Sequence, residues 1–179
     1  ITTGGGGAIL TQNKKIALKA KHLIQQAKTS IWFNHDNIGY NYRMINVQAA
    51  IGLAQIKKFN QIKTKKRIIY NKYYNLFCKN NLVKLLVHQK NSNNWMNVIN
   101  IKNYNKNKLI KLIKELEKYN IETRPVWKPN HLQPKFLKYQ KYKINNAKSL
   151  VNSSLCIPSS ADLNTRDLDK FYKILCKNI

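Results

Sequence analysis

Along residues 91–179, short segments with the apolar pattern of a strand alternate with segments that have the apolar pattern of a helix. This order restricts the fold more than any other feature of the sequence. Residues 95–101, Trp-Met-Asn-Val-Ile-Asn-Ile, favour a half-buried strand with Ile99 and Ile101 on one face. Leu109, Ile113 and Leu116 instead share one side of an amphipathic helix. The patterns predict strands over 95–101, 121–126 and 155–157, and helices over 106–119, 145–152 and 165–176. Strands that alternate with helices in this way form a small α/β domain.

The preceding residues do not complete a domain. Residues 8–11 predict a strand without a neighbouring strand to pair with, and a helix is expected from Asn13 to about residue 27. An irregular loop over 28–43 follows, and Asn46 is the expected N-cap of the next helix. We therefore expect the C-terminal remnant of a larger domain in residues 1–58, a connecting helix and linker in 59–90, and the small α/β domain in 91–179, with further residues upstream of Ile1.

Lysine dominates the charge of the chain. The sequence has 33 Lys and Arg against 7 Asp and Glu, a formal net charge of +26, and only four of the basic residues are arginines. An excess of this size predicts a nucleic acid or another polyanion as partner. Arginine is preferred for bidentate recognition of phosphates and bases, and the lysines are spread along the chain with many asparagines. A chain-wide compositional drift is therefore the favoured explanation of the charge, and a selected polyanion site is the alternative. Both readings stay open at this level.

The cysteines, carboxylates and histidines of the sequence limit the kinds of reaction that the chain can catalyse. Three distant cysteines predict free thiols in a reducing compartment, and no apolar run approaches the roughly 18–20 residues of a membrane span. The start of the chain does not have the pattern of a signal peptide, so a cytoplasmic protein is expected. Neither the seven carboxylates nor the four histidines have a spacing that predicts a metal site. If the chain takes part in catalysis, we expect a cofactor to supply the reactivity.

Two short segments suggest close approach of a ligand. The glycines of 4–7 match neither the GxGxxG pattern of dinucleotide-binding loops nor the GxxxxGK pattern of nucleotide-binding loops. They are explained by close approach of the backbone to another group or by a flexible turn. Residues 39–43, Gly-Tyr-Asn-Tyr-Arg, present an amide and a guanidinium just before a helix. This combination can hold a phosphate, and ordinary loop packing is the alternative.

Taken together, four blocks resemble the DegT/DnrJ/EryC1/StrS family of sugar aminotransferases that depend on pyridoxal 5′-phosphate (PLP). Residues 1–7 resemble the ITTGEGG segment of the family, and residues 39–55 resemble its GYNYRMxNxQAAxGxxQ block. Residues 121–134, with Arg-Pro-Val-Trp and His-Leu-Gln-Pro, resemble a block of the small domain, and residues 155–160 resemble the final strand. The blocks keep their order and spacing across nearly the whole chain. Details such as Gly5 and the Pro-Ser-Ser of 158–160 favour the legionaminic-acid and bacillosamine branch.

The resemblance implies the α/β architecture of fold type I aminotransferases, in this case its C-terminal fragment. Family members work as homodimers with shared active sites and use PLP to move an amino group, usually from glutamate, to a keto carbon of a nucleotide-linked deoxysugar, here most simply C4. Such enzymes serve cell-surface glycan biosynthesis. By family spacing, the Schiff-base lysine lies two residues before Ile1, so this polypeptide alone is expected to be inactive.

The resemblance also implies site residues. Asn41 matches the position that reaches the PLP phosphate of the neighbouring subunit, and Arg43 matches one that contacts that phosphate or the sugar pyrophosphate. His131 is implied to lie near the substrate, with Arg124 and Trp127 shaping its pocket. For these three residues, a structural role in a strand end or a core is the alternative. The small residues among 47–54 are the expected subunit contact.

Two other functions stay open. Some relatives carry histidine in place of the lysine and dehydrate sugars with PLP, and others are regulatory, so the residues upstream of Ile1 decide between these reactions. A basic module that binds nucleic acid is the second possibility, and it predicts tight, strongly salt-dependent binding.

Overall fold

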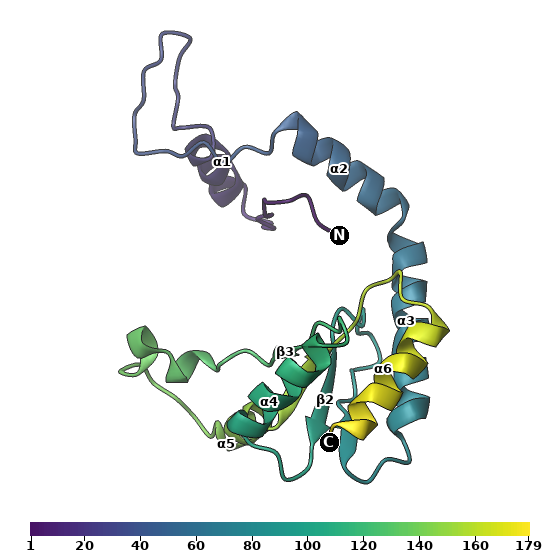
Figure 1. Cartoon of the computed structure of the whole chain (residues 1–179). Helices are drawn as coiled ribbons and strands as arrows, with labels where there is room; N and C mark the ends of the chain where they lie inside the picture. The colour runs from purple at the N-terminus through teal and green to yellow at the C-terminus, as the bar shows by residue number, and fades with distance from the viewer. The chain divides into compact units, whose positions relative to one another are not determined.

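The computed structural model describes residues 1–179 and consists of two compact units, Ile1–Asn60 and Gln61–Ile179 (Figure 1). The boundary falls just inside the long helix α3, Phe59–Phe77, and this helix confirms the one expected at the start of 59–90. None of the helices combines the length and the apolar character that crossing a bilayer requires.

The second unit is built on a four-stranded antiparallel sheet with the strand order β1-β2-β4-β3. The strands are β1 (Val83–Leu85), β2 (Asn97–Ile101), β3 (Arg124–Pro125) and β4 (Ser154–Ile157). Along β2, Asn97, Ile99 and Ile101 are buried while the residues between them are half-buried, so the alternation expected of this strand is confirmed. All four residues of β4 are buried, which fits its central position in the sheet.

Three helices pack against this sheet and close a single apolar core (Figure 1). They are α3, α4 (Lys106–Glu117) and α6 (Thr165–Lys177), each contributing three buried side chains. Asn164 caps α6 through a capping box with Asp167. A shorter helix, α5 (Asn145–Val151), and two 3-10 turns, η1 (Asn130–Leu132) and η2 (Pro134–Phe136), complete the unit.

The first unit contains the helices α1 (Lys14–Leu23) and α2 (Asn46–Lys57), neither of which buries a residue within the chain. Asn13 caps α1, because its side chain accepts hydrogen bonds from the amides of Lys15 and Ile16. α2 has apolar side chains on all sides rather than on one face. Most of the apolar surface of this unit is therefore exposed.

Several boundaries differ from the sequence prediction. Residues 8–11 form no strand, because the first unit offers no strand for them to pair with. Asn46 is the first residue of α2 and not its cap; the cap position is Ile45, which makes no side-chain bond. β1 was not expected, because its apolar run is too short to show a period. The strand expected over 121–126 is reduced to two residues at the sheet edge, where Pro125 cannot donate to a ladder.

Candidate functional site

The hairpin of residues 24–42 positions the predicted phosphate ligands. Its two sides meet in the isolated bridges Gln25↔Asn41 and Lys28↔His35. Three backbone bonds close its base: the amide of Gln26 donates to the carbonyl of Tyr40 (3.1 Å), that of Tyr40 to Leu23 (2.7 Å), and that of Tyr42 to Ile24 (3.0 Å). The backbone of Asn41 is therefore held between two bonded neighbours.

Gly39 is required where the two sides of the hairpin touch. A Cβ atom at this position would lie 2.3 Å from the amide nitrogen of Ala27 and 2.3 Å from the carbonyl carbon of Gln26. Gln26 and Ala27 themselves adopt left-handed φ angles of 65° and 51°, so α1 ends at Leu23 and not near residue 27. The glycine of the Gly-Tyr-Asn-Tyr-Arg segment is thus explained by backbone packing.

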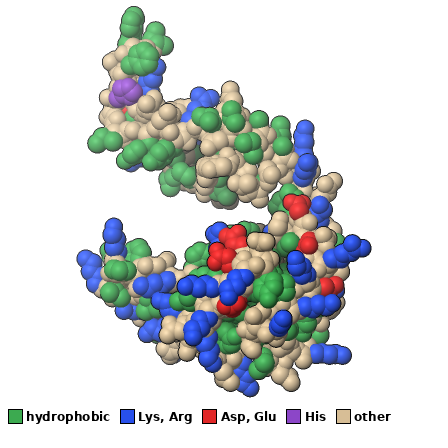
Figure 2. Space-filling model, in the orientation of Figure 1, with side chains coloured by type: hydrophobic (Ala, Val, Ile, Leu, Met, Phe, Trp, Pro, Cys, Tyr) green, Lys and Arg blue, Asp and Glu red, His purple; other side chains and the backbone are tan.

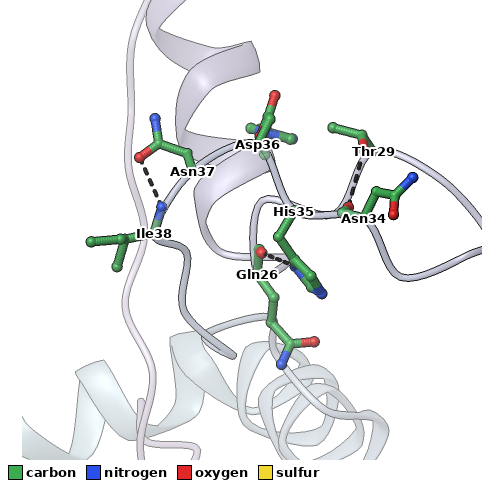
Figure 3. Close-up of polar contacts among 8 residues, drawn as sticks. Gln26, Thr29, Asn34, His35, Asp36, Asn37 and Ile38 are labelled. Carbon is green, nitrogen blue, oxygen red and sulfur yellow. Dashed lines mark hydrogen bonds and ion pairs between the residues drawn. The ribbon is translucent and has the colours of Figure 1, made fainter.

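Side chains brace the outer part of the hairpin (Figure 3). The ring Nδ1 of His35 donates to the carbonyl of Gln26 at 2.7 Å, and the hydroxyl of Thr29 donates to the carbonyl of Asn34 at 3.0 Å. Asp36 reaches back to α1, where its carboxylate lies 2.5 Å from Nε2 of His22. These bonds tie the hairpin to itself and to the preceding helix.

Asn41 and Arg43 line a hollow of about 540 Å³ on this hairpin. The remaining lining residues are Gln25, Gln26, Lys28, Thr29, Ser30 and Ile31. The lining contains amides, hydroxyls, a lysine and an arginine but no carboxylate, and Arg43 takes part in none of the ion pairs of the chain. Hydrogen-bond donors and positive charge without a competing acid suit a phosphate.

A second hollow of about 910 Å³ adjoins the glycine run and shares Asn41 and Arg43 in its lining. Gly4 and Gly6 have positive φ angles of 78° and 113°, which favour glycine. The run also lies close to α2, since a Cβ at Gly52 would come within 3.2 Å of the Thr3 side chain. The glycine run and the Asn41–Arg43 segment therefore border one space in the first unit.

Sequence reasoning missed the other donors of the smaller hollow. Gln25, Lys28, Thr29 and Ser30 belong to the stretch Gln-Gln-Ala-Lys-Thr-Ser, whose density of amides, hydroxyls and a cation was the available signal. Their approach to Asn41 depends on the hairpin, and this long loop contains no recognisable hairpin turn signal.

The three candidate residues of the second unit do not meet in one cavity. Arg124 lines a cavity of about 560 Å³ and is bound by Glu122, with 2.9 Å between Nε and the carboxylate. Trp127 and His131 do not line this cavity. Trp127 stacks on Trp95, and His131 lies in η1 with its Nε2 buried and without a hydrogen-bond partner.

Burial changes the ionisation of two groups near these residues. It raises the pKa of Tyr73, which lines the cavity and whose hydroxyl donates to the carbonyl of Pro158 at 2.9 Å; the charge of Asp167 acts in the same direction. Burial lowers the pKa of Lys66, whose ammonium group donates to the carbonyls of Trp95 and Ser159. Through these hydrogen bonds, Tyr73 and Lys66 hold the backbone just before β2 and just after β4.

Known proteins share both the sequence and the fold of this chain. The family model described as "DegT/DnrJ/EryC1/StrS aminotransferase family" matches residues 1–175. GDP-perosamine synthase of Escherichia coli O157:H7 is 34% identical over 94% of this chain and 46% of its own length. UDP-4-amino-4,6-dideoxy-N-acetyl-beta-L-altrosamine transaminase of Campylobacter jejuni serotype O:2 is 29% identical over 97% of this chain and 47% of its own length.

The fold comparison agrees. The PLP form of Spr1654 from Streptococcus pneumoniae matches 97% of this chain and 46% of that chain with a TM-score of 0.79 at 17% identity. The mixed α/β fold is thus that of fold type I aminotransferases. The chain spans about half the length of the curated relatives that it matches. On the match of residues 1–175, the chain belongs to the DegT/DnrJ/EryC1/StrS aminotransferase family.

Proposed function

We propose that this chain is part of a PLP-dependent aminotransferase that moves an amino group from glutamate to a keto carbon, C4, of a nucleotide-linked deoxysugar for cell-surface glycans. Family membership and the activities by which the two relatives are named support the reaction. The observation that carries the proposal is the carboxylate-free hollow lined by Asn41 and Arg43. The enzyme acts in the cytoplasm, with residues 1–58 belonging to the large domain, 59–90 connecting it, and 91–179 forming the small domain.

The residues of the hollow fit the phosphate of PLP. The Asn41 amide donates a hydrogen bond to a phosphate oxygen, and the Arg43 guanidinium offers two parallel donors and a positive charge. The bonded base of the hairpin keeps both groups in place before the phosphate arrives, which reduces the entropy lost on binding. When bound, PLP supplies the electron sink that the side chains of the protein lack.

In this proposal, the PLP whose phosphate Asn41 and Arg43 contact lies in the active site of a second copy of the protein. α2, which directly follows the Asn41–Arg43 segment, exposes Val47, Leu53 and Ile56 by 57–66%. A helix that is apolar all round is usually buried, so the region 47–54 is the proposed homodimer contact. Each subunit then contributes Asn41 and Arg43 to the active site of its partner.

Arg124, Trp127 and His131 contact the nucleotide sugar in this proposal. Nε2 of His131 is buried and has no hydrogen-bond partner. A substrate group that displaces the atoms covering this nitrogen can form a hydrogen bond with it. Arg124 is exposed, and a diphosphate can compete with Glu122 for its guanidinium. Trp127 exposes 61% of its surface.

The reading frame before the Ile1 codon provides the first test. We expect lysine two residues upstream, because the reaction needs an amine there to hold PLP and to move protons. Histidine at this position would instead support a PLP-dependent sugar dehydratase. Any other residue would contradict both reactions and support a regulatory member of the family.

Replacement of Asn41 tests the hollow. In the protein that carries the lysine, Asn41→Ala should weaken PLP binding about tenfold or more, because a hydrogen bond to a charged group contributes about 1.5–3 kcal/mol. Titration of the PLP absorbance band measures the affinity. Asn37→Ala is the matched control, since the Asn37 side chain bonds only to the adjacent amide of Ile38 on the same hairpin. Unchanged affinity in Asn41→Ala would remove Asn41 from the site.

A further inference from the structure

Two tryptophans of the second unit form a stacked pair on the surface. The ring centroids of Trp95 and Trp127 are 5.7 Å apart and their planes differ by 26°. Trp95 is 59% exposed and Trp127 is 61% exposed, and neither belongs to the apolar core. Each indole therefore uses one face for its partner and leaves much of the remaining surface open to solvent.

The backbone of Trp95 is fixed from both sides. Its amide donates to Oδ1 of Asn93 at 3.0 Å, and its carbonyl accepts from the ammonium group of Lys66 at 3.2 Å. Lys66 also donates to the carbonyl of Ser159, whose hydroxyl accepts from the amide of Asn97 at 2.9 Å. An exposed indole with such support is held ready for a ligand, because little freedom remains to be lost on binding.

We propose that the Trp95–Trp127 pair is the surface on which the nucleobase of a nucleotide sugar stacks. This inference rests on the proposed function and adds Trp95 and the base-binding role to it. Indole faces stack on the planar rings of any base, and the surrounding positive charge of the chain favours the attached diphosphate. Lys66, which donates to the carbonyl of Trp95, and Lys128, which is adjacent to Trp127 in the sequence, supply such charge.

The test separates stacking from charge. The full 179-residue chain is prepared with Trp32→Phe, which leaves Trp95 and Trp127 as its only indoles. GDP, UDP and inorganic pyrophosphate are then titrated by calorimetry and by tryptophan fluorescence. We expect at least one nucleotide to quench the fluorescence and to bind about tenfold or more tightly than pyrophosphate, which has similar charge but no base.

Variants of the pair locate the effect. Trp95→Ala and Trp127→Ala should each remove most of the nucleotide advantage and leave pyrophosphate binding unchanged, whereas Trp95→Phe should keep part of it because a smaller aromatic face remains. Circular dichroism checks each variant, and Trp95→Leu replaces Trp95→Ala if the latter unfolds.

Equal affinity for nucleotides and pyrophosphate would overturn the proposal, as would a nucleotide advantage that survives loss of either indole. Neither result bears on the residue upstream of Ile1 or on PLP binding through Asn41, so the aminotransferase proposal would stand or fall separately.

Discussion

The two units of the chain bury apolar side chains to very different extents. Among residues 1–60 only Ala27 is buried, whereas the second unit closes a core of fourteen apolar residues. On the face shown in Figure 2, Lys and Arg side chains are scattered over the second unit, with Asp and Glu among them. The second unit can thus be specified by its own residues, while the first depends on caps, on hairpin bonds and, in the proposed dimer, on the partner surface that would cover α2.

Matched leucine substitutions give the largest expected contrast. Leu116→Ala removes a fully buried side chain from the core, and we expect it to lower the free energy of unfolding by about 2–5 kcal/mol. Leu53→Ala makes the same change in α2, where the side chain is 57% exposed, and should change the free energy by less than about 0.5 kcal/mol. Urea unfolding of the 179-residue chain measures both values. A large loss in Leu53→Ala would show that α2 is packed within the chain.

Gly39→Ala tests the bonds that hold the first unit. The added methyl group would meet the backbone of Gln26 and Ala27, and overpacking of this kind costs about 1–3 kcal/mol. Hydrogen exchange at the amides of Tyr40 and Tyr42 should therefore speed up, while the urea midpoint of the second unit stays the same.

Gly7→Ala is the control for this substitution, because a Cβ at Gly7 has no atom within 4 Å. Unchanged exchange in Gly39→Ala would mean that the two sides of the hairpin do not touch in solution.

High pH should weaken the second unit selectively. Burial first, and the charge of Asp167 second, raise the folded-state pKa of Tyr73 above the value of about 10 in an unfolded chain. Above that pH the unfolded chain releases a proton that the folded chain retains, so the free energy of unfolding falls by up to about 1.4 kcal/mol per pH unit. Tyr73→Phe should flatten this slope between pH 10 and 11.5 in urea titrations.

Tyr74→Phe, on the exposed side of the same helix, is the matched control for the alkaline effect. The raised pKa values of Tyr104 and Cys156, both due to burial, leave a smaller slope of the same sign in every variant. If Tyr73→Phe leaves the pH dependence of the free energy of unfolding unchanged, the loss of stability at high pH is due to Tyr104 and Cys156.

The sequence predicted the elements that carry a period of their own. α4 and α6 show apolar side chains on one face and a capping asparagine, so local pattern and burial agree. In β2 the burial alternates strictly, with Ile99 and Ile101 on the buried face beside the polar Asn97. The predictions that were wrong concern elements that depend on pairing with residues distant in the sequence. β1 is defined by pairing with β2, and residues 8–11 are not a strand because no strand lies beside them.

The candidate site shows the same division. The Asn41–Arg43 segment could be singled out because an amide and a guanidinium precede a helix, and the structure places both side chains in one hollow. Lys28 and Ser30 join them only through the hairpin, which the turn preferences of its residues do not reveal. The stacking of Trp95 on Trp127 was equally invisible, since the two residues are far apart in the sequence.

The two ends of the sheet affect how this protein behaves at high concentration. An outer strand with free amides can recruit a strand from another molecule and begin aggregation. β3 is two residues long and one of them is Pro125, and β1 is three residues long with Lys84 at its centre. Both borders are therefore poor templates for a further strand, so that even a chain this rich in exposed apolar side chains is protected along its sheet against fibrous self-association.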